Sequence, residues 1–381
     1  MEWKTYSIAE IGEVVGGGTP STSNSEFWGG DIPWITPKDL TGYYQIYISH
    51  GANFLTDKGL RAGTRLLPKD TILFSSRAPI GYIAIASNPI CTNQGFKSII
   101  CKKELVYPLF LYYYIKSNLD YFKIFGTGAT FPEISGTKMK KIKVSLPPLS
   151  IQRKIASILS AYDNLIENNN KRIKLLEQMA ETLYKEWFVR FRFPGYENVE
   201  KENGLPKGWK VEYLGNVAKI STGKCNREDA EEEGLYPLFD RSQEIKRSNT
   251  WIKDCEAIIV PGEGTSFIPR YFEGKFNLHQ RCYCVEPEIN RTGKYLFYTI
   301  MINRSYFLSV ATGATVPSLR QNNFTKMKFV FPSIKLVQNY DDIVSKCFAE
   351  IHSLHQQSQL LIRQRDLLLP RLMSSKLEVK P

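Results

Sequence analysis

The sequence of 381 residues has no apolar run of about 18 residues, the length that a membrane-spanning helix requires. Its first residues, MEWKTYSIAE, contain neither the basic nor the apolar segment of a secretory signal peptide. It has seven cysteines but no CxxC pair, which suits a reducing compartment better than a disulfide framework. We therefore expect a cytoplasmic protein that does not contact a membrane.

Signatures of catalysis are also scarce. The sequence has no Walker A loop, and its one Pro-Pro pair, in SLPPL (145–149), lacks the Asn or Asp with which a methyltransferase grips a flipped adenine. The four histidines have no recognisable Ser or Cys partner. The sequence thus predicts a non-catalytic chain that binds no metal and no cofactor.

Two metal-dependent alternatives are less favoured. Asp254 with Glu273-Gly-Lys275 has the spacing of a degenerate Mg²⁺-nuclease triad, but such triplets arise often by chance in charged, strand-rich segments. Zinc could be held by His279, Cys282, Cys284 and Cys255. Tetrahedral zinc usually takes two close ligand pairs, whereas Cys282 and Cys284 alternate along one predicted strand, so we interpret these cysteines as buried thiols.

The charge balance points to a polyanionic partner. The formal net charge is +12, and the basic residues are spread along the chain instead of being gathered in a tail. This distribution suits a nucleic acid that lies across much of the molecule. Many basic proteins bind no nucleic acid, so charge alone does not decide the function.

A repeat sets the domain organisation. GTGATFPEIS (126–135) and ATGATVPSLR (311–320) match at an offset of 185, which continues through KIKVSLP (141–147) and KMKFVFP (326–332). Nearer the start, Trp3-Lys4 matches Trp209-Lys210 at an offset of 206, so the second copy is about 21 residues shorter. A period this long indicates two whole domains and not a solenoid.

Each copy predicts a strand-rich domain followed by a long helix. The strand-rich domains are 1–149 and 205–333, with short apolar runs between turns. The helices are 150–192, followed by a linker at 193–204, and 334–381, which includes a C-terminal tail. We expect an α+β fold: two similar α/β domains separated by an antiparallel coiled coil about 54 Å long, with pseudo-two-fold symmetry.

The predicted seam of the coiled coil follows a 4-3-4-3 spacing. A polar break at Asn168–Asn170 interrupts its centre, where a buried amide could fix the register. The predicted seam positions are Ile151, Ile155, Ile158, Tyr162, Leu165, Asn169, Arg172, Leu176, Met179 and Leu183 in the first helix, and Leu336, Tyr340, Ile343, Cys347, Glu350, Leu354, Gln357, Leu361, Gln364 and Leu368 in the second.

Several longer motifs resemble one family. GGGTPSTSNSEFWGGDIPWITPKDL (16–40), SSRAPIGYIAIA (75–86), NQGFKSI (93–99) and the segment from LPPLSIQRKIAS to KEWFVRF (146–191) are similar to the DNA-specificity subunit of type I restriction–modification enzymes, over essentially the whole chain. The resemblance implies two target-recognition domains that each read one half of a bipartite, asymmetric site in double-stranded DNA. It also implies two methyltransferase subunits docked on the helices and nuclease–translocase subunits for restriction. S-adenosylmethionine, ATP and Mg²⁺ would bind to those partners.

The second domain departs from the pattern of the first. STGKCNREDAEEEGLYPLFD replaces the GGGTPST segment, and VPGEGTSFIPRYF replaces SSRAPIGYIAI. We therefore expect the two half-sites to differ in sequence.

Side chains that could contact DNA are polar or basic residues in predicted loops. The candidates in the first domain are Thr19, Lys38, Arg77, Asn93, Gln94, Lys97, Thr127 and Thr130, and in the second Lys224, Arg227, Arg241, Gln280, Arg281, Thr312 and Thr315. Any of them could instead be a solvated surface residue. The repeated Thr-Gly-Ala-Thr loop itself could be conformational, with a glycine required by the backbone.

Aromatic side chains crowd the end of the first helix. Tyr184, Trp187 and Phe188 most simply pack this end onto the second domain, and the resemblance suggests instead a docking patch for a partner subunit. Three other functions stay open at this stage: a stand-alone two-headed DNA-binding regulator, a single-chain nuclease and a two-headed protein-interaction scaffold.

Overall fold

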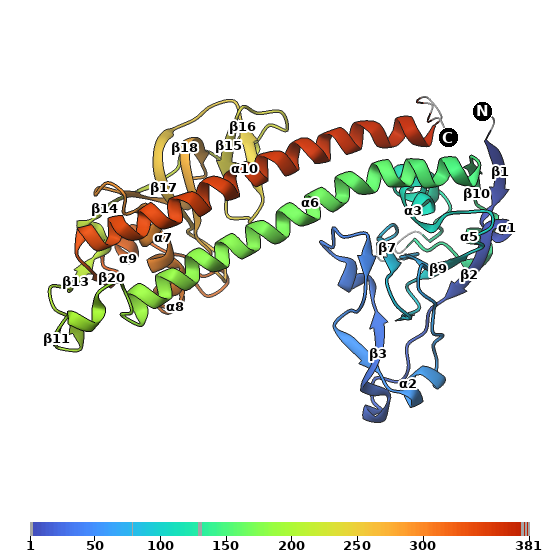
Figure 1. Cartoon of the computed structure of the whole chain (residues 1–381), viewed down its shortest axis with the longest axis horizontal. Helices are drawn as coiled ribbons and strands as arrows, with labels where there is room; N and C mark the ends of the chain where they lie inside the picture. Colours follow the sequence, from blue (N-terminus) through green and yellow to red (C-terminus); the bar gives the residue numbers. More distant parts are fainter. Residues whose placement is uncertain (1–2, 78, 129–131, 375–376, 378, 380–381) are drawn as a thin grey trace. The chain divides into compact units, whose positions relative to one another are not determined.

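The computed structural model describes residues 3–77, 79–128, 132–374, 377 and 379. Backbone contacts divide the chain into two compact units, Met1–Lys171 with Leu354–Pro381 (unit 1) and Arg172–Ser353 (unit 2). Each unit combines one strand-rich domain with a segment of both long helices (Figure 1). In the described part of the chain, no helix is long and apolar enough to cross a membrane.

Unit 1 is built on a five-stranded sheet of order β2-β9-β6-β7-β4, in which β4 and β7 are parallel and the other neighbours antiparallel. A small sheet, β5-β3-β8, and the antiparallel pair β1–β10 accompany it. The strands are β1 (Lys4–Ser7), β2 (Gly12–Gly16), β3 (Trp28–Ile35), β4 (Tyr47–Ile48), β5 (Asn53–Leu55), β6 (Ile72–Phe74), β7 (Ile83–Ala86), β8 (Cys91–Thr92), β9 (Lys97–Cys101) and β10 (Lys143–Leu146). The short helices are α1 (Ile8–Ile11), η1 (Ser25–Phe27), η2 (Pro37–Leu40), α2 (Asp57–Arg61), α3 (Pro108–Ser117), α4 (Leu119–Lys123) and α5 (Gly136–Lys141).

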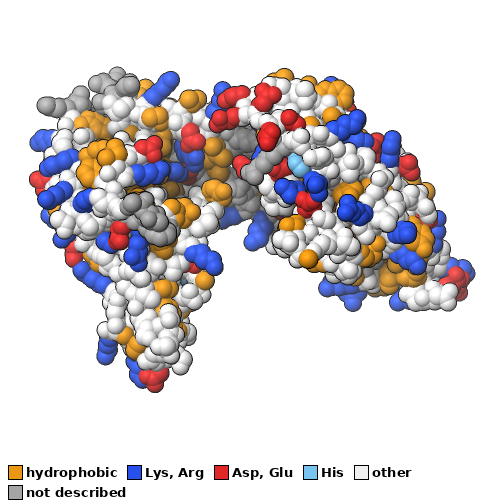
Figure 2. Space-filling view, turned by 180° about the vertical axis from the view of Figure 1, so that it is seen from behind, with side chains coloured by type: hydrophobic (Ala, Val, Ile, Leu, Met, Phe, Trp, Pro, Cys, Tyr) orange, Lys and Arg blue, Asp and Glu red, His pale blue; other side chains and the backbone are white. Residues whose placement is uncertain are grey.

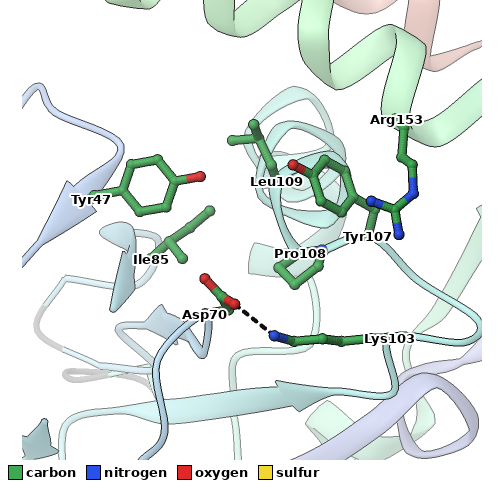
Figure 3. A pocket seen from close by; sticks show the side chains of 8 residues that line it. All are labelled: Tyr47, Asp70, Ile85, Lys103, Tyr107, Pro108, Leu109 and Arg153. Carbon is green, nitrogen blue, oxygen red and sulfur yellow. Dashed lines mark hydrogen bonds and ion pairs between the residues drawn. The ribbon is translucent and has the colours of Figure 1, made fainter. Parts of the chain in front are cut away.

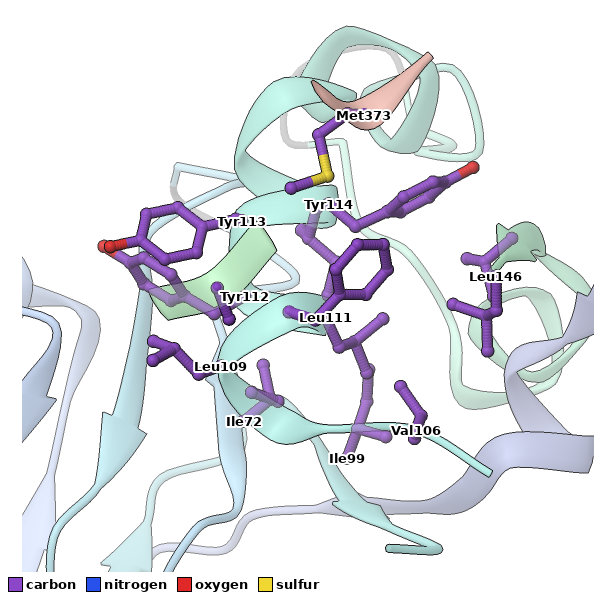
Figure 4. Close-up of a cluster of buried hydrophobic side chains, with 14 of the residues drawn as sticks. Ile72, Ile99, Val106, Leu109, Leu111, Tyr112, Tyr113, Tyr114, Leu146 and Met373 are labelled. Atoms are coloured by element: carbon purple, nitrogen blue, oxygen red, sulfur yellow. The ribbon is translucent and has the colours of Figure 1, made fainter. Parts of the chain in front are cut away.

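The helix α3 lies in the core of unit 1. A proline is well suited to its first turn, and all residues from Pro108 to Ile115 are buried. Because the helix is covered on all sides, its sequence is apolar and aromatic all round instead of amphipathic. Figure 4 shows Ile72 and Ile99 of the sheet near its beginning and Met373, from the last helix, near its end.

Unit 2 is built on a six-stranded sheet of order β14-β19-β17-β18-β15-β16. The strands are β11 (Lys201–Glu202), β12 (Leu205–Pro206), β13 (Lys210–Tyr213), β14 (Ala218–Thr222), β15 (Tyr236–Phe239), β16 (Ile245–Ser248), β17 (Lys253–Pro261), β18 (Arg270–Leu278), β19 (Cys282–Pro287) and β20 (Lys328–Phe331). The short helices are η4 (Tyr196–Asn198), η5 (Leu214–Asn216), η6 (Arg227–Asp229), α7 (Gly293–Ile302), α8 (Arg304–Val310) and α9 (Gln321–Thr325).

The two units share one framework. The strand order β2-β9-β6-β7-β4 corresponds to β14-β19-β17-β18-β15, and unit 2 adds β16 at the edge. The outer pairs also have the same register, with Lys4 opposite Leu146 in β1–β10 and Lys210 opposite Phe331 in β13–β20. The predicted duplication of a whole domain is therefore confirmed.

Nearly all of the length difference between the copies arises in one interval. By strand register, Gly16 corresponds to Thr222 and Ile72 to Ile258, so the offset falls from 206 to 186 between these points. In this interval unit 1 builds β3 and β5, two of the three strands of its small sheet. The second copy has no strands equivalent to β3 and β5 there and builds β16 instead, in an interval that is 20 residues shorter.

The two long helices are α6 (Leu149–Tyr184), which continues into the π-helical turn η3 (Lys185–Val189), and α10 (Ile334–Met373). In unit 1, Asp163 is paired with Arg365 at 2.5 Å. In unit 2, Arg172 is paired with Glu350 at 2.6 Å, and the Tyr340 hydroxyl donates to the Ala180 carbonyl oxygen at 3.0 Å. Partner numbers decrease along α10 as they increase along α6, so the predicted antiparallel pairing is confirmed within each unit.

The predicted seam of α6 is correct at its start and at Asn169, and it is wrong at Leu165, Arg172 and Met179. Ile151 and Ile155 are buried as expected, but Met179 is 61% exposed, and Ala180 is buried in its place. Likewise Ile173 is buried in place of Arg172. On α10 the same one-residue shift buries Val337, Val344 and Ser358 in place of Leu336, Ile343 and Gln357.

The shift arises because the covered face of α6 repeats every 11 residues. Ile151, Tyr162, Ile173 and Tyr184 are buried or half-buried at this spacing. An 11-residue repeat corresponds to about 3.67 residues per turn, which is near the value of a straight helix. The seven-residue repeat of the predicted seam corresponds to about 3.5 residues per turn. Over 36 residues this small difference moves the seam by one position.

Asn169 is a buried amide that bonds across the helix pair in unit 1. Its side chain is 3% exposed, and its amide donates to Gln357 Oε1 at 2.9 Å and to Ser358 Oγ at 3.3 Å. Sliding α10 along α6 would leave this buried amide unpaired, at a cost of about 1–3 kcal/mol. The prediction of a buried amide at the polar break is confirmed, and its role in setting the register stays a prediction.

Candidate nucleic-acid interface

In unit 1 the glycine-rich loop after β2 touches the turn before β9. Thr19 Oγ1 donates a hydrogen bond to Gln94 Oε1. A Cβ on Gly17 would lie 2.0 Å from the Asn93 carbonyl oxygen, so this close approach requires glycine. The Asn93 side chain accepts from the Gly95 N–H at 2.9 Å and shapes the turn. Thr19, Asn93 and Gln94 are therefore brought together on two adjoining loops.

Lys38 belongs to the same neighbourhood. It is exposed on the helical turn η2, whose first residue is Pro37. A Cβ on Gly95 would lie 3.0 Å from Pro37 Cγ, so η2 packs directly on the turn that carries Gln94.

Three further candidates for DNA contact lie next to Glu133. Its carboxylate lies 3.1 Å from Lys97 Nζ and 3.7 Å from the Arg77 guanidinium, and its backbone pairs with Thr127. Thr130 lies outside the described residues. The Arg77 and Glu133 side chains are each more than a third exposed, so their ion pair contributes about 1 kcal/mol or less and can be exchanged for another anion.

In unit 2 a nearly buried carboxylate holds two arginines. Glu263, whose side chain is 12% exposed, lies 2.6 Å from the Arg241 guanidinium and is also bonded to Arg281. Next to Arg281, the Gln280 amide donates to Asn226 Oδ1 at 2.7 Å. The residues Arg241, Gln280 and Arg281, taken from two different loops, are thus brought together.

The repeated Thr-Gly-Ala-Thr loop has an equivalent place in both units. In unit 2 the backbone of Thr312 pairs with Ser318, and Ser318 pairs with Glu263, just as Thr127 pairs with Glu133 and Glu133 with Arg77 in unit 1. Gly128 and Gly313 have φ of 120° and 121°, where a side chain is disfavoured. The conformational role of this loop is therefore clear, and Thr127, Thr312 and Thr315 are exposed on it.

The charges at matched positions differ between the two units. Arg77 of unit 1 corresponds to Glu263 of unit 2, and Glu133 corresponds to Ser318. In unit 1 the carboxylate comes from the Thr-Gly-Ala-Thr loop, and in unit 2 it follows β17. Glu133 and Glu263 were not among the candidates because acidic side chains do not bind DNA directly. Their signal in the sequence would have been the change of charge at matched positions, from Arg77 to Glu263 and from Glu133 to Ser318.

A hollow of about 320 Å³ adjoins the arginines of unit 2. It is lined by Asp240, Arg241, Ser242, Glu263, Gly264, His279 and Val316. Burial alone would raise the pKa of Asp240, but the bonds from Lys246 at 2.7 Å and from Ser242 outweigh it and bring the pKa to about 2. Burial and the nearby Arg241 lower the pKa of His279, so at neutral pH the arginines adjoin carboxylates and a neutral imidazole.

Lys224 and Arg227 are less well defined as parts of this surface. Lys224 is exposed, and its N–H donates to the Leu278 carbonyl oxygen at 3.1 Å, which keeps it close to the turn that carries Gln280. The side chain of Arg227, on η6, lies outside the described residues.

Unit 1 contains another hollow, of about 220 Å³, which includes none of the candidate residues among its described lining. Figure 3 shows the ion pair between Asp70 and Lys103, with atoms 2.6 Å apart, and Arg153 of α6 beside the Tyr107 ring. This hollow lies where α6 meets the start of α3, and its side chains already pair with one another. It does not form part of the candidate interface.

The basic surface is spread over both units. Figure 2 shows Lys and Arg side chains on both, interleaved with Asp and Glu, on the face that is drawn. The cations near Glu133 and Glu263 each have a carboxylate partner that favours one direction of the side chain, although the arginines stay more than a third exposed. Orientation is what base recognition needs, while unoriented lysines suffice for phosphates.

The aromatic residues at the end of α6 belong to the core of unit 2. Tyr184, Trp187 and Phe188 are each about 5–6% exposed, and the Phe188 ring lies 4.8 Å from that of Tyr295 and 5.2 Å from that of Tyr340. These side chains leave no face for a partner subunit. The core interpretation therefore replaces the docking patch suggested by the resemblance.

The chain matches the family model described as type I restriction modification DNA specificity domain over residues 1–178 and 206–361. The type I restriction enzyme MjaIX specificity subunit of Methanocaldococcus jannaschii is 35% identical over 100% of this chain and 94% of that protein. The EcoR124I/EcoR124II specificity subunit of Escherichia coli is 30% identical over 52% of this chain and 50% of that protein.

A solved structure has the same fold. The S subunit of a type I restriction-modification system from M. genitalium matches with a TM-score of 0.65 and 17% identity, covering 97% of this chain and 96% of that one. The family model matches both copies of the duplicated domain, and the M. jannaschii relative is similar along the whole chain. The protein therefore belongs to the DNA-specificity subunits of type I restriction–modification enzymes, the non-catalytic chains that recognise the target sequence.

Proposed function

We propose that this chain reads a bipartite, asymmetric site in double-stranded DNA, with one half-site for each unit. It would direct adenine methylation by two methyltransferase subunits and cleavage by nuclease–translocase subunits, in the cytoplasm. S-adenosylmethionine, ATP and Mg²⁺ would be bound by those partners. The observation that carries the proposal is the duplicated framework, which presents equivalent loops with different oriented cations.

The different cation arrangements favour different half-sites. In unit 1 Glu133 orients one arginine and one lysine, and in unit 2 Glu263 orients two arginines. Arginine can bind the O6 and N7 atoms of guanine with two parallel hydrogen bonds, whereas lysine acts as a point charge. Arg241 and Arg281 are therefore our first choices for base contacts in the second half-site, and Arg77 in the first.

Glu263→Gln tests this assignment. Removing the charge releases both arginines, so we expect discrimination at the second half-site to fall by about tenfold or more, within the 1–3 kcal/mol of a bidentate contact. The measurement is binding of the assembled complex to cognate DNA and to DNA altered in one half-site at a time. Glu273→Gln, which removes an exposed carboxylate from β18, is the control. Equal effects of both variants, or a loss at the first half-site, would contradict the assignment.

Two exposed leucines support paired docking sites for the methyltransferase subunits. Leu175 on α6 and Leu360 on α10 are 185 positions apart, the offset of the duplication, and are 59% and 61% exposed. Two identical partners require two equivalent surfaces on a duplicated chain. We therefore assign one leucine to each partner, in place of the buried aromatic residues.

Replacing each leucine by aspartate should then remove one partner. Leu175→Asp or Leu360→Asp should leave one methyltransferase subunit bound, and the double variant none, because a charge opposes burial of this surface. The measurement is the mass of the purified complex. Leu235→Asp, at a leucine that is 69% exposed in a loop of unit 2, is the control. A double variant that retains both partners would refute these docking sites.

The helix pair should set the gap between the half-sites. Four residues inserted after Asn170 and four after Ser353 would lengthen both helices by about 6 Å, or about two base-pair steps of 3.4 Å. Both helices must be lengthened, because contacts such as Asp163–Arg365 and Arg172–Glu350 fix their pairing on each side of the insertions.

We expect the doubly lengthened chain to direct methylation of sites whose gap is about two base pairs longer, with both half-site sequences unchanged. The measurement is the pattern of methylated adenines in cellular DNA. Insertion in α6 alone is the control and should abolish methylation, since it breaks the helix pairing. Methylation by the doubly lengthened chain at sites with the original gap would show that the length of the helices does not set the gap.

A further inference from the structure

Three potential metal ligands meet on the sheet of unit 2, outside the candidate interface. Cys255 lies in β17, and Cys284 and Glu286 lie in β19, the antiparallel neighbour of β17. The two Sγ atoms and a carboxylate oxygen of Glu286 all lie within 4.8 Å of one another. They form a compact set drawn from two strands.

We propose that Cys255, Cys284 and Glu286 bind a zinc ion, through two thiolates and one carboxylate, with a water molecule as the fourth ligand. Zn²⁺ takes sulfur and oxygen ligands at about 2.0–2.3 Å, and sulfur donors favour it over Mg²⁺ or Ca²⁺. The ligand set differs from the one considered from the sequence. Among the described residues, His279 and Cys282 do not belong to this cluster.

The surrounding charges balance such an ion. Two thiolates and one carboxylate carry three negative charges, and Zn²⁺ with Lys253 supplies three positive ones. Lys253 Nζ already lies 3.0 Å from Glu286 Oε2. The charges of the ion, its three ligands and Lys253 must sum to about zero here, because an uncompensated charge is costly to bury. Cys284 is fully buried and the other two ligands are half-buried.

Metal binding by the two thiols is coupled to proton release. Each thiol that forms a Zn–S bond releases its proton to the buffer, so binding should strengthen as the pH rises.

Unit 1 supplies an internal comparison. By strand register, the positions of Cys255, Cys284 and Glu286 correspond to Lys69, Ser98 and Ile100, which cannot form this site. The proposed ion would join β17, which leads to Glu263, to β19, which follows Arg281. It would stabilise the two strands that position these residues in the second recognition domain alone.

Cobalt substitution tests the site on the full-length chain. Reduced, metal-stripped protein is titrated with Co²⁺ alone, which reports thiolate ligands by a near-ultraviolet charge-transfer band, and Zn²⁺ is then added as competitor. We expect one ion per chain, displacement by Zn²⁺, and at least tenfold weaker binding for Cys255→Ser. Cys347→Ser, at a half-buried cysteine on α10, is the control and should behave like the parent chain.

Two further variants keep the test decisive if Cys255→Ser fails to fold. Glu286→Gln should weaken binding while retaining the charge-transfer band, because both thiolates remain. Lys253→Met should leave the charge-transfer band in place, because it removes only the ion pair with Glu286 and neither thiolate. A titration without a charge-transfer band, or a band of equal strength and affinity in folded Cys255→Ser, would overturn the proposal. The result is independent of DNA binding.

Discussion

The constraint on which the structure depends is that both long helices belong to both hydrophobic cores. The first half of α6 contributes Ile151 and Ile155 to the core of unit 1, and its end contributes Ala180 and Tyr184 to the core of unit 2. Helix α10 runs in the opposite direction, so residues near its start pack in the core of unit 2 and residues near its end pack in the core of unit 1. These residues are Val337, Tyr340 and Val344 in unit 2, and Leu369, Leu372 and Met373 in unit 1. Neither recognition domain has a complete core without both helices. Because burial of apolar surface dominates folding stability, the helices cannot separate without loss of the domains.

Within this constraint the two units keep one strand framework and differ in the strands added to it and in the polar groups that it presents. The strand order and the outer strand pairs are retained, while Arg77 is replaced by Glu263 and Glu133 by Ser318. An ion pair at a loop can be rearranged at small cost, whereas a change in strand register would move a whole face out of the core. A duplicated framework can therefore acquire a new pattern of DNA contacts without a new fold.

The sequence predicted the duplication, the two strand-rich domains and the antiparallel helices, because these depend on offsets and apolar patterns that a linear sequence preserves. It placed the seam wrongly at Met179, where an apolar side chain happens to fit a seven-residue spacing but the helix follows an 11-residue one. It also missed Glu133 and Glu263, since acidic residues are unexpected on a surface for DNA and their role appears only when the paired cations are seen. The DNA-contact roles of all the candidate residues stay predictions, and Thr130 and the side chain of Arg227 lie outside the described residues.

The central claim is that this chain alone determines a two-part target sequence. It is tested most directly by mapping methylated adenines in the DNA of otherwise identical cells that carry or lack the gene. Our account predicts that the gene adds methylation at one motif consisting of two different half-sites separated by a gap of constant length. Methylation at a single continuous motif, or at two identical half-sites, would contradict the account, as would a methylation pattern that does not change when the gene is removed.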